Sequence, residues 1–148
     1  MREILFRGKT LATESKWVEG FYNHILCGRF MCDEHCIQTI NEDGRIGQLY
    51  NVYDSTVGQF TGLTDKNGKK VFEGDIVKAY VIQNTGMKVR KYTETYVVAY
   101  HPKYCYFYLK RKGNNLLFDG NWAYGVFIEE VVGNIHDNPE LLEVEYDG

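Results

Sequence analysis

A run of turn-forming residues ahead of an apolar alternation is the strongest constraint on the fold of this chain. Residues 61–77 read "TGLTDKNGKKVFEGDIV" and contain three glycines and an Asp-Lys-Asn-Gly tetrapeptide. Asn and Gly adopt positive φ angles at which other residues clash, so the tetrapeptide predicts a tight turn. Gly74 permits a sharp bend before "DIVKAYVI", in which Val77, Ala79 and Val81 share one face of a predicted strand. The run therefore predicts the bend that folds a small β-barrel, and not a loop that holds a ligand.

Composition favours a mainly β protein. The 148 residues fit one ordinary domain, and the 44% hydrophobic content suffices for a core. Twelve Tyr, eight Phe and 15 Gly, with only two Pro, favour strands joined by tight turns. No stretch approaches the roughly 20 apolar residues that cross a bilayer, and no targeting segment is seen. We expect a soluble cytoplasmic protein without a membrane partner.

Four cysteines, at 27, 32, 36 and 105, are too few for a disulfide scaffold and indicate a reducing compartment. Cys105 lies in an alternation with Phe107 and Leu109 on one face, which predicts a buried thiol.

A second group of cysteines raises the question of a metal ion. Cys27, Cys32, His35 and Cys36 are zinc-ligand types, but they lack a Cys-x2-Cys pair and a matching downstream pair. The alternative to a metal site is two strands around an acidic turn at 33–34, or a loop with a helical turn. We expect no metal and no cofactor.

Local signals predict further elements along the chain. Gly20, within "KWVEGFY", indicates a bulge or a close approach of two backbones. Asp43-Gly44 predicts a hairpin turn. Asn138-Pro139-Glu140 predicts a short helical turn near the end of the sequence.

Charge is unevenly distributed along the chain. Residues 1–64 carry six Lys/Arg and eight Asp/Glu, residues 65–112 carry eleven and four, and residues 113–148 carry none and eight. The net charges are therefore −2, +7 and −8. The basic middle and the acidic tail can pair within one chain or between chains, and the second case predicts a homo-oligomer.

The basic middle segment is also rich in tyrosine. Stacking aromatic rings beside cations that pair with phosphates are the two parts of a single-strand-binding face. The residues of this candidate nucleic-acid or partner surface are Lys88, Arg90, Lys91, Tyr92, Lys103, Tyr104, Tyr106, Tyr108, Lys110, Arg111 and Lys112. The overall acidity, with a sequence pI of about 5.8, argues for the alternative that these lysines protect strand edges from aggregation.

Three stretches together resemble the YopX-like family of phage and prophage proteins. They are "TVGQFTGLTDKNGKKVFEGDIV" at 56–77, "VVGNIHDNPELLE" at 131–143 and the opening "REILFRGK". The resemblance implies a mainly β fold with a barrel of SH3 type, a phage or prophage origin, and no catalytic residues to carry over. We accordingly expect N-terminal strands and loops over 1–57 that pack on an SH3-like barrel over 58–148.

Acidic residues of the same run offer an alternative interpretation as a site. Asp65, Glu73 and Asp75 are of types that bind Mg²⁺ or act as an acid pair, and His136 lies next to Asp137. Structural roles in a turn and at the start of a strand explain the three carboxylates, and no metal-binding or acid–base role is needed. Neighbours in sequence do not make a catalytic triad, so we assign no catalytic residue.

Three functional hypotheses follow. The first is a non-enzymatic binding or self-assembling module of a phage or prophage. The second is a nucleic-acid-binding protein that uses the Tyr/Lys/Arg sheet face, and the third is an enzyme of unrecognised type. The sequence contains no nucleotide-binding loop motif and no metalloprotease motif, so a small-molecule ligand is not indicated.

Overall fold

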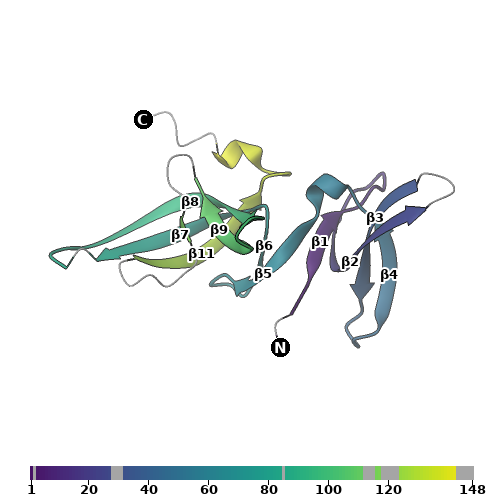
Figure 1. The fold of residues 1–148 in the computed structure, drawn as a ribbon, viewed down its shortest axis with the longest axis horizontal. Helices are drawn as coiled ribbons and strands as arrows, with labels where there is room; N and C mark the ends of the chain where they lie inside the picture. Colours follow the sequence, from purple (N-terminus) through teal and green to yellow (C-terminus); the bar gives the residue numbers. More distant parts are fainter. Residues whose placement is uncertain (2, 28–31, 85, 112–115, 118–123, 143–148) are drawn as a thin grey trace. The chain divides into compact units, whose positions relative to one another are not determined.

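A computed structural model describes the chain except residues 2, 28–31, 85, 112–115, 118–123 and 143–148 (Figure 1). The described part is mainly β, as predicted, with two antiparallel sheets. The chain divides into two compact units, residues 1–62 and 63–148. None of the described helices is long and apolar enough to cross a membrane.

The first unit contains β1 (Phe6–Lys9), β2 (Trp17–Cys27), β3 (Cys32–Ile40), β4 (Ile46–Asn51) and the 3-10 helix η1 (Asp54–Thr56). Strand β5 (Gly58–Thr64) contains the boundary between the units. The second unit contains β6 (Lys70–Phe72), β7 (Asp75–Asn84), β8 (Val89–His101), β9 (Tyr106–Lys110), β10 (Leu116–Leu117), β11 (Tyr124–Asn134) and the 3-10 helix η2 (Pro139–Leu142). Helix η2 confirms the helical turn predicted at 138–140.

Hydrogen bonding orders the strands β4-β3-β2-β1-β5-β6 in one sheet and β10-β9-β8-β7-β11 in the other. The pairings among the described strands are those of two open sheets. They do not include a closed ring, so the SH3-like barrel stays a prediction.

The hairpin of β2 and β3 organises the first unit. Its register runs from Gly20 opposite Thr39 to Cys27 opposite Cys32. Buried Val18, Ile37 and Val52 form the core of this unit, with further half-buried aromatic and apolar side chains around them. A Cβ built on Gly20 would lie 2.0 Å from the carbonyl oxygen of Gln38, which confirms the predicted close approach of two backbones.

One detail of the first unit differs from the prediction. Two strands are confirmed for residues 25–40, but the acidic turn at Asp33 and Glu34 is wrong, because both residues lie within β3 and pair with Leu26 and Ile25. The regular pairing of two long strands outweighs the turn preference of one acidic dipeptide. The hairpin turn predicted at Asp43-Gly44 is confirmed, with Gly44 at φ 79°.

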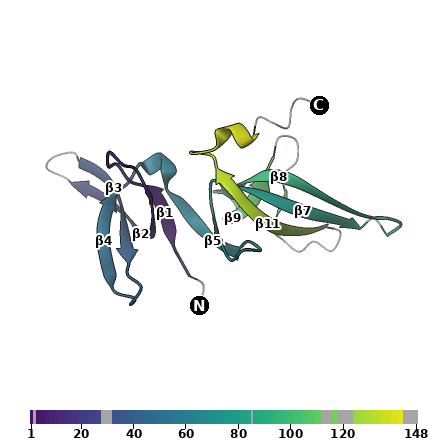
Figure 2. The same ribbon diagram turned by 180° about the vertical axis from the view of Figure 1, so that it is seen from behind.

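Strands β7, β8 and β11 run side by side in the second unit (Figures 1 and 2). The predicted inner face of β7 is confirmed, because Val77, Ala79 and Val81 are fully buried. Tyr96 and Leu109 are the largest side chains of the same core.

The bend at 61–77 consists of two corners with β6 between them. Gly68 and Gly74 have φ angles of 78° and 85°, which side chains with a Cβ rarely adopt. The amide of Gly68 donates to the carbonyl oxygen of Asp65, as a tight turn requires. The predicted turn at 65–68 and the bend at Gly74 are confirmed.

The turn between β8 and β9 corrects the prediction for Cys105. This residue is exposed and has a φ of 55°. Its amide donates to the carbonyl oxygen of His101, 2.8 Å away, so Cys105 closes the turn, and β9 begins only at Tyr106. The apolar face that was predicted to begin at Cys105 therefore begins at Phe107.

Candidate functional site

Four aromatic rings gather where β8 turns into β9. The ring of His101, the last residue of β8, lies 4.8 Å from Tyr104, 5.4 Å from Tyr106 and 6.0 Å from Tyr108. Tyr104 is 59% exposed and stacks on Tyr106 at 6.1 Å with the rings 6° from parallel. The ammonium of Lys103 lies 5.2 Å from the Tyr104 ring. We call His101, Lys103, Tyr104, Tyr106, Tyr108 and Lys110 the tyrosine surface.

Strand periodicity explains this clustering. Leu109 is fully buried in the core, so its neighbours Tyr108 and Lys110 point to the other face of β9, together with Tyr106. The predicted grouping of Tyr104, Tyr106 and Tyr108 is confirmed as a spatial cluster. His101 was not among the predicted residues. Its place before Pro102, at the end of a strand, is a usable signal, because the last residue of one strand of a hairpin pairs with the first residue of the next, here Tyr106.

The other predicted surface residues lie elsewhere. Arg90 and Lys91 are near the start of β8, and eleven residue steps to His101 span roughly 36 Å in an extended strand. Exposed Lys88 precedes the same strand. Tyr92 is opposite Val81, on the face that carries the core. Lys112 is outside the described residues. The predicted surface is therefore not continuous, because Lys88, Arg90 and Lys91 lie far along β8 from the tyrosine surface.

Lys91 belongs to a second aromatic group on β7, β8 and β11. The Tyr80 and Phe127 rings stack at 4.9 Å, and the Lys91 ammonium lies 4.2 Å from the Tyr80 ring. Phe127 is 46% exposed. Lys91 was predicted as a surface residue but the two rings were not, because the contact between the rings depends on the register between β7 and β11.

Arg111 has a structural partner. Its guanidinium forms an ion pair with Glu94, and the Tyr96 hydroxyl donates to the same carboxylate at 2.8 Å. Burial alone would raise the pKa of Glu94, but the hydrogen bonds from Arg111 and Tyr96 outweigh it and lower the pKa. Burial, and then the Glu94 carboxylate, raise the pKa of Tyr96. Arg111 therefore neutralises a half-buried carboxylate next to the core.

The acidic residues of the bend bind backbone amides. Asp65 is buried and accepts hydrogen bonds from the amides of Asn67 and Lys69 at 2.9 Å and of Val131 at 3.0 Å. Burial alone would raise the pKa of Asp65, but these bonds outweigh it, so the pKa is lowered. Asp75 is also buried and accepts a hydrogen bond from the Phe72 amide at 2.7 Å. These contacts support the predicted structural roles of both carboxylates.

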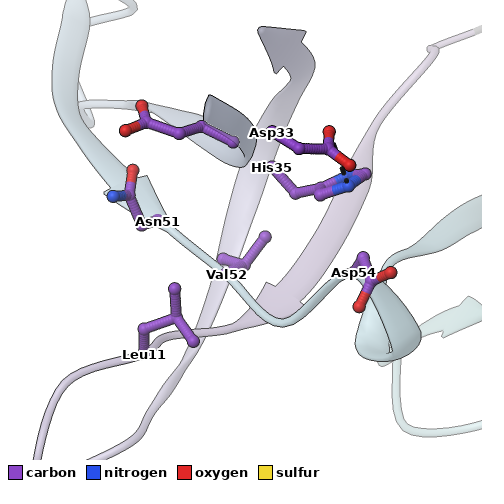
Figure 3. A pocket seen from close by; sticks show the side chains of 7 residues that line it. Leu11, Asp33, His35, Asn51, Val52 and Asp54 are labelled. Carbon is purple, nitrogen blue, oxygen red and sulfur yellow. Dashed lines mark ion pairs between the residues drawn. The ribbon is translucent and has the colours of Figure 1, made fainter. Parts of the chain in front are cut away.

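A pocket of about 300 Å³ lies in the first unit (Figure 3). Figure 3 shows the side chains of Asp33 and His35 next to one another, with Asp54 of η1 close by. The complete lining is Leu11, Asp33, Glu34, His35, Asn51, Val52 and Asp54.

The two described members of the Cys/His group considered in the sequence, His35 and Cys36, lie on opposite faces of β3. His35 contacts His24, Tyr22 and Asp33, whereas buried Cys36 points to the other face of β3 and donates to the side-chain oxygen of Asn51. Burial, and then Glu34, raise the pKa of the Cys36 thiol, which disfavours the thiolate that a metal needs. The side chains of Cys27 and Cys32 are outside the described residues.

The fold and the tyrosine surface define an antiparallel β protein with a solvent-facing cluster of aromatic and basic side chains. A family model described as "YopX protein" matches residues 12–143. The chain belongs to the YopX family. Its structure is also similar to the crystal structure of protein EF1440 from Enterococcus faecalis, with a TM-score of 0.49 and 23% identity over 96% of this chain and 99% of that one. No curated protein matches the sequence.

Proposed function

We propose that this chain is a non-enzymatic binding module whose tyrosine surface binds single-stranded nucleic acid. The stacked pair of exposed Tyr104 and half-buried Tyr106 next to Lys103 is the observation that supports this function. Such rings stack on bases of any sequence, and neighbouring ammonium groups pair with the phosphates.

Two further observations support binding at this surface. The segment that carries it, residues 65–112, has a net charge of +7 although the whole chain has −3. Two exposed cations of this segment, Lys103 and Lys110, belong to the tyrosine surface and are available to pair with phosphates. The carboxylates of Asp65 and Asp75 already bind backbone amides, which supports a module without an acid–base centre at the bend.

Binding of a fluorescent single-stranded oligonucleotide to the full chain, followed by anisotropy, tests this proposal. Changing Tyr104 and Tyr106 to Ala is expected to weaken binding about 5- to 150-fold for each ring that loses a base, and Lys103→Ala is expected to reduce the salt dependence. Affinity of the unmodified chain should fall as salt rises from about 50 to about 200 mM.

Two control variants separate this surface from other residues of the same types. Tyr53→Ala removes an exposed tyrosine of the first unit, and Arg111→Gln removes a predicted surface cation that is paired with Glu94. Both are expected to leave the affinity unchanged. Absence of binding, binding that does not change with salt, or equal losses in the controls would contradict the proposal.

Self-assembly is a second candidate, because one sheet face of the first unit exposes apolar side chains. Phe21, Ile25 and Leu49 share that face by register and are 50%, 39% and 46% exposed. Exposed apolar clusters of this kind mark protein interfaces, so a second copy of the chain is the proposed occupant.

Light scattering on a size-exclusion column tests self-assembly. The unmodified chain is expected to elute as an oligomer, and Leu49→Lys is expected to shift it to the monomer mass. Leu63→Lys is the control, because this exposed leucine lies outside that face. A monomer at every protein and salt concentration would contradict self-assembly.

Three further features are proposals of the same kind. The resemblance to phage and prophage proteins supports a phage or prophage origin, and the strongly bent segment at 61–77 supports closure of the second unit into an SH3-like barrel. Buried Cys36 and exposed Cys105 are both free thiols, which supports a reducing bacterial cytoplasm.

A further inference from the structure

We propose that His24, Asp33 and His35 form a binding site for a divalent transition-metal ion, with Zn²⁺ as its representative. The site is in the first unit, on the β2–β3 hairpin, and is independent of the tyrosine surface. It also differs from the Cys/His cluster considered in the sequence, with which it shares only His35.

Cross-strand register creates this arrangement. His24 lies directly opposite His35, and their rings stack with centroids 4.3 Å apart and planes 13° from parallel. Asp33 is two residues before His35 on the same face of β3, so its carboxylate reaches both rings. The Nε2 atom of His24 hydrogen-bonds to Asp33 Oδ1, and Nε2 of His35 lies 3.6 Å from the same oxygen. One ligand atom of each residue lies within 4.8 Å of the other two.

An ion at this position would replace the contacts that Asp33 makes with the two histidine rings. Zinc binds imidazole nitrogen at about 2.0–2.1 Å and carboxylate oxygen at about 2.0–2.2 Å, so tetrahedral ligand atoms lie roughly 3.3 Å apart. Because an imidazole nitrogen binds a metal in the plane of its ring, the stacked His24 ring must tilt away from the His35 ring, and the Asp33 carboxylate must turn with it, before all three ligand atoms point at one ion. Asp33 and His24 are 62% and 41% exposed, which leaves room for these rotations and for the ion to reach them.

A second layer of contacts holds His35 in a ligating orientation. The Tyr22 hydroxyl lies 2.5 Å from Nδ1 of His35, which fixes the ring and leaves Nε2 directed at Asp33. Metal-binding histidines usually have such a partner on the other ring nitrogen. The side chain of Asp54 lines the same pocket as Asp33 and His35 and adds negative charge to it.

The ligand set determines which ions the site favours and what occupies the fourth coordination position. Two imidazoles and one carboxylate suit zinc, copper or nickel, and they favour these ions over Mg²⁺ or Ca²⁺, which prefer oxygen ligands throughout. Three protein ligands leave the fourth tetrahedral position to a water molecule, for which the pocket of about 300 Å³ has space.

Calorimetric titration of the full chain with Zn²⁺ tests the site. We expect saturable binding of one ion per chain. His24→Ala and Asp33→Asn are each expected to weaken it at least about tenfold, the Asn variant without loss of side-chain volume. His136→Ala is the matched histidine control in the other unit, and circular dichroism checks that each variant is folded. The proposal would be overturned if the unmodified chain showed no saturable binding. It would also be overturned if the His24 and Asp33 variants bound Zn²⁺ as tightly as the unmodified chain does.

Cysteine ligation is the competing explanation for any zinc that binds. The Cys27→Ser/Cys32→Ser/Cys105→Ser variant should keep its affinity, and the spectrum of the unmodified chain with Co²⁺ should lack a thiolate charge-transfer band. Loss of binding in the serine variant, or a thiolate band in the unmodified chain, would assign the ion to cysteines and overturn the proposal.

Discussion

Asp65→Ala is expected to lower the free energy of unfolding by about 3 kcal/mol, because it removes an ionised acceptor of buried backbone amides. The carboxylate of Asp65 bonds three amides, two in its own turn and that of Val131 on β11. Alanine leaves the Val131 amide buried without this acceptor and removes one bond between the turn and β11, where the Lys66 amide still donates to the carbonyl oxygen of Glu129. Urea denaturation at neutral pH measures the loss.

The exposed turn residue Asp43 provides the control for this prediction. Its side chain accepts a hydrogen bond from the Arg45 amide in a solvent-facing hairpin turn, so Asp43→Ala is expected to cost less than about 1 kcal/mol. Equal, small losses at the two positions would contradict the structural role of Asp65.

The same carboxylate makes stability depend on pH. The pKa of Asp65 is lowered in the folded chain relative to the unfolded one. Its contribution is therefore complete above the unfolded pKa of about 3.9 and is lost as the pH falls through the lower folded pKa. Asp65→Asn is expected to flatten the acid side of the stability profile relative to the unmodified chain. Profiles of equal slope would show that the folded pKa is not lowered.

Gly20→Ala is expected to lower the free energy of unfolding by about 3 kcal/mol, for a steric reason. A Cβ at this position would lie 2.0 Å from the backbone oxygen of Gln38, and a backbone atom within a sheet cannot rotate away. Strand β2 lies between β1 and β3, so a shift of Gly20 disturbs its pairing with both Phe6 and Thr39. Thermal or urea denaturation measures the change.

Gly44→Ala distinguishes this steric effect from the loss of a flexible residue. Gly44 has a positive φ, but a Cβ there would have open space around it. Only the backbone conformation then costs free energy, about 1–2 kcal/mol. A Gly20→Ala variant that is no less stable than Gly44→Ala would contradict the close approach of β2 to β3.

Local rules predicted several elements of the second unit. Turn chemistry located the corners at Gly68 and Gly74, and period-two alternation identified the buried face of β7. Cys105 was predicted incorrectly, because the alternation continues through a residue that hydrogen bonding places in a turn. Asp33 was predicted incorrectly because the turn preference of an acidic pair is weaker than regular strand pairing.

The contacts of the His24–His35 pair and of the Tyr80–Phe127 pair depend on the register between strands, which a single sequence does not specify. The cluster of Tyr104, Tyr106 and Tyr108 was predictable because the three residues lie within one short stretch. The contact of His24 with His35 requires the β2–β3 register, and that of Tyr80 with Phe127 joins residues far apart in the chain. Once two strands are accepted for residues 25–40, an antiparallel hairpin centred between 29 and 30 places His24 opposite His35.

An NMR titration of the isotope-labelled full chain with a single-stranded oligonucleotide tests the proposed function most directly. We predict that the largest amide shifts fall at residues 101–110, the stretch that carries the tyrosine surface, and that they diminish as salt is raised. Shifts confined to the bend at 65–75, or no shifts at all, would contradict binding through the tyrosine surface.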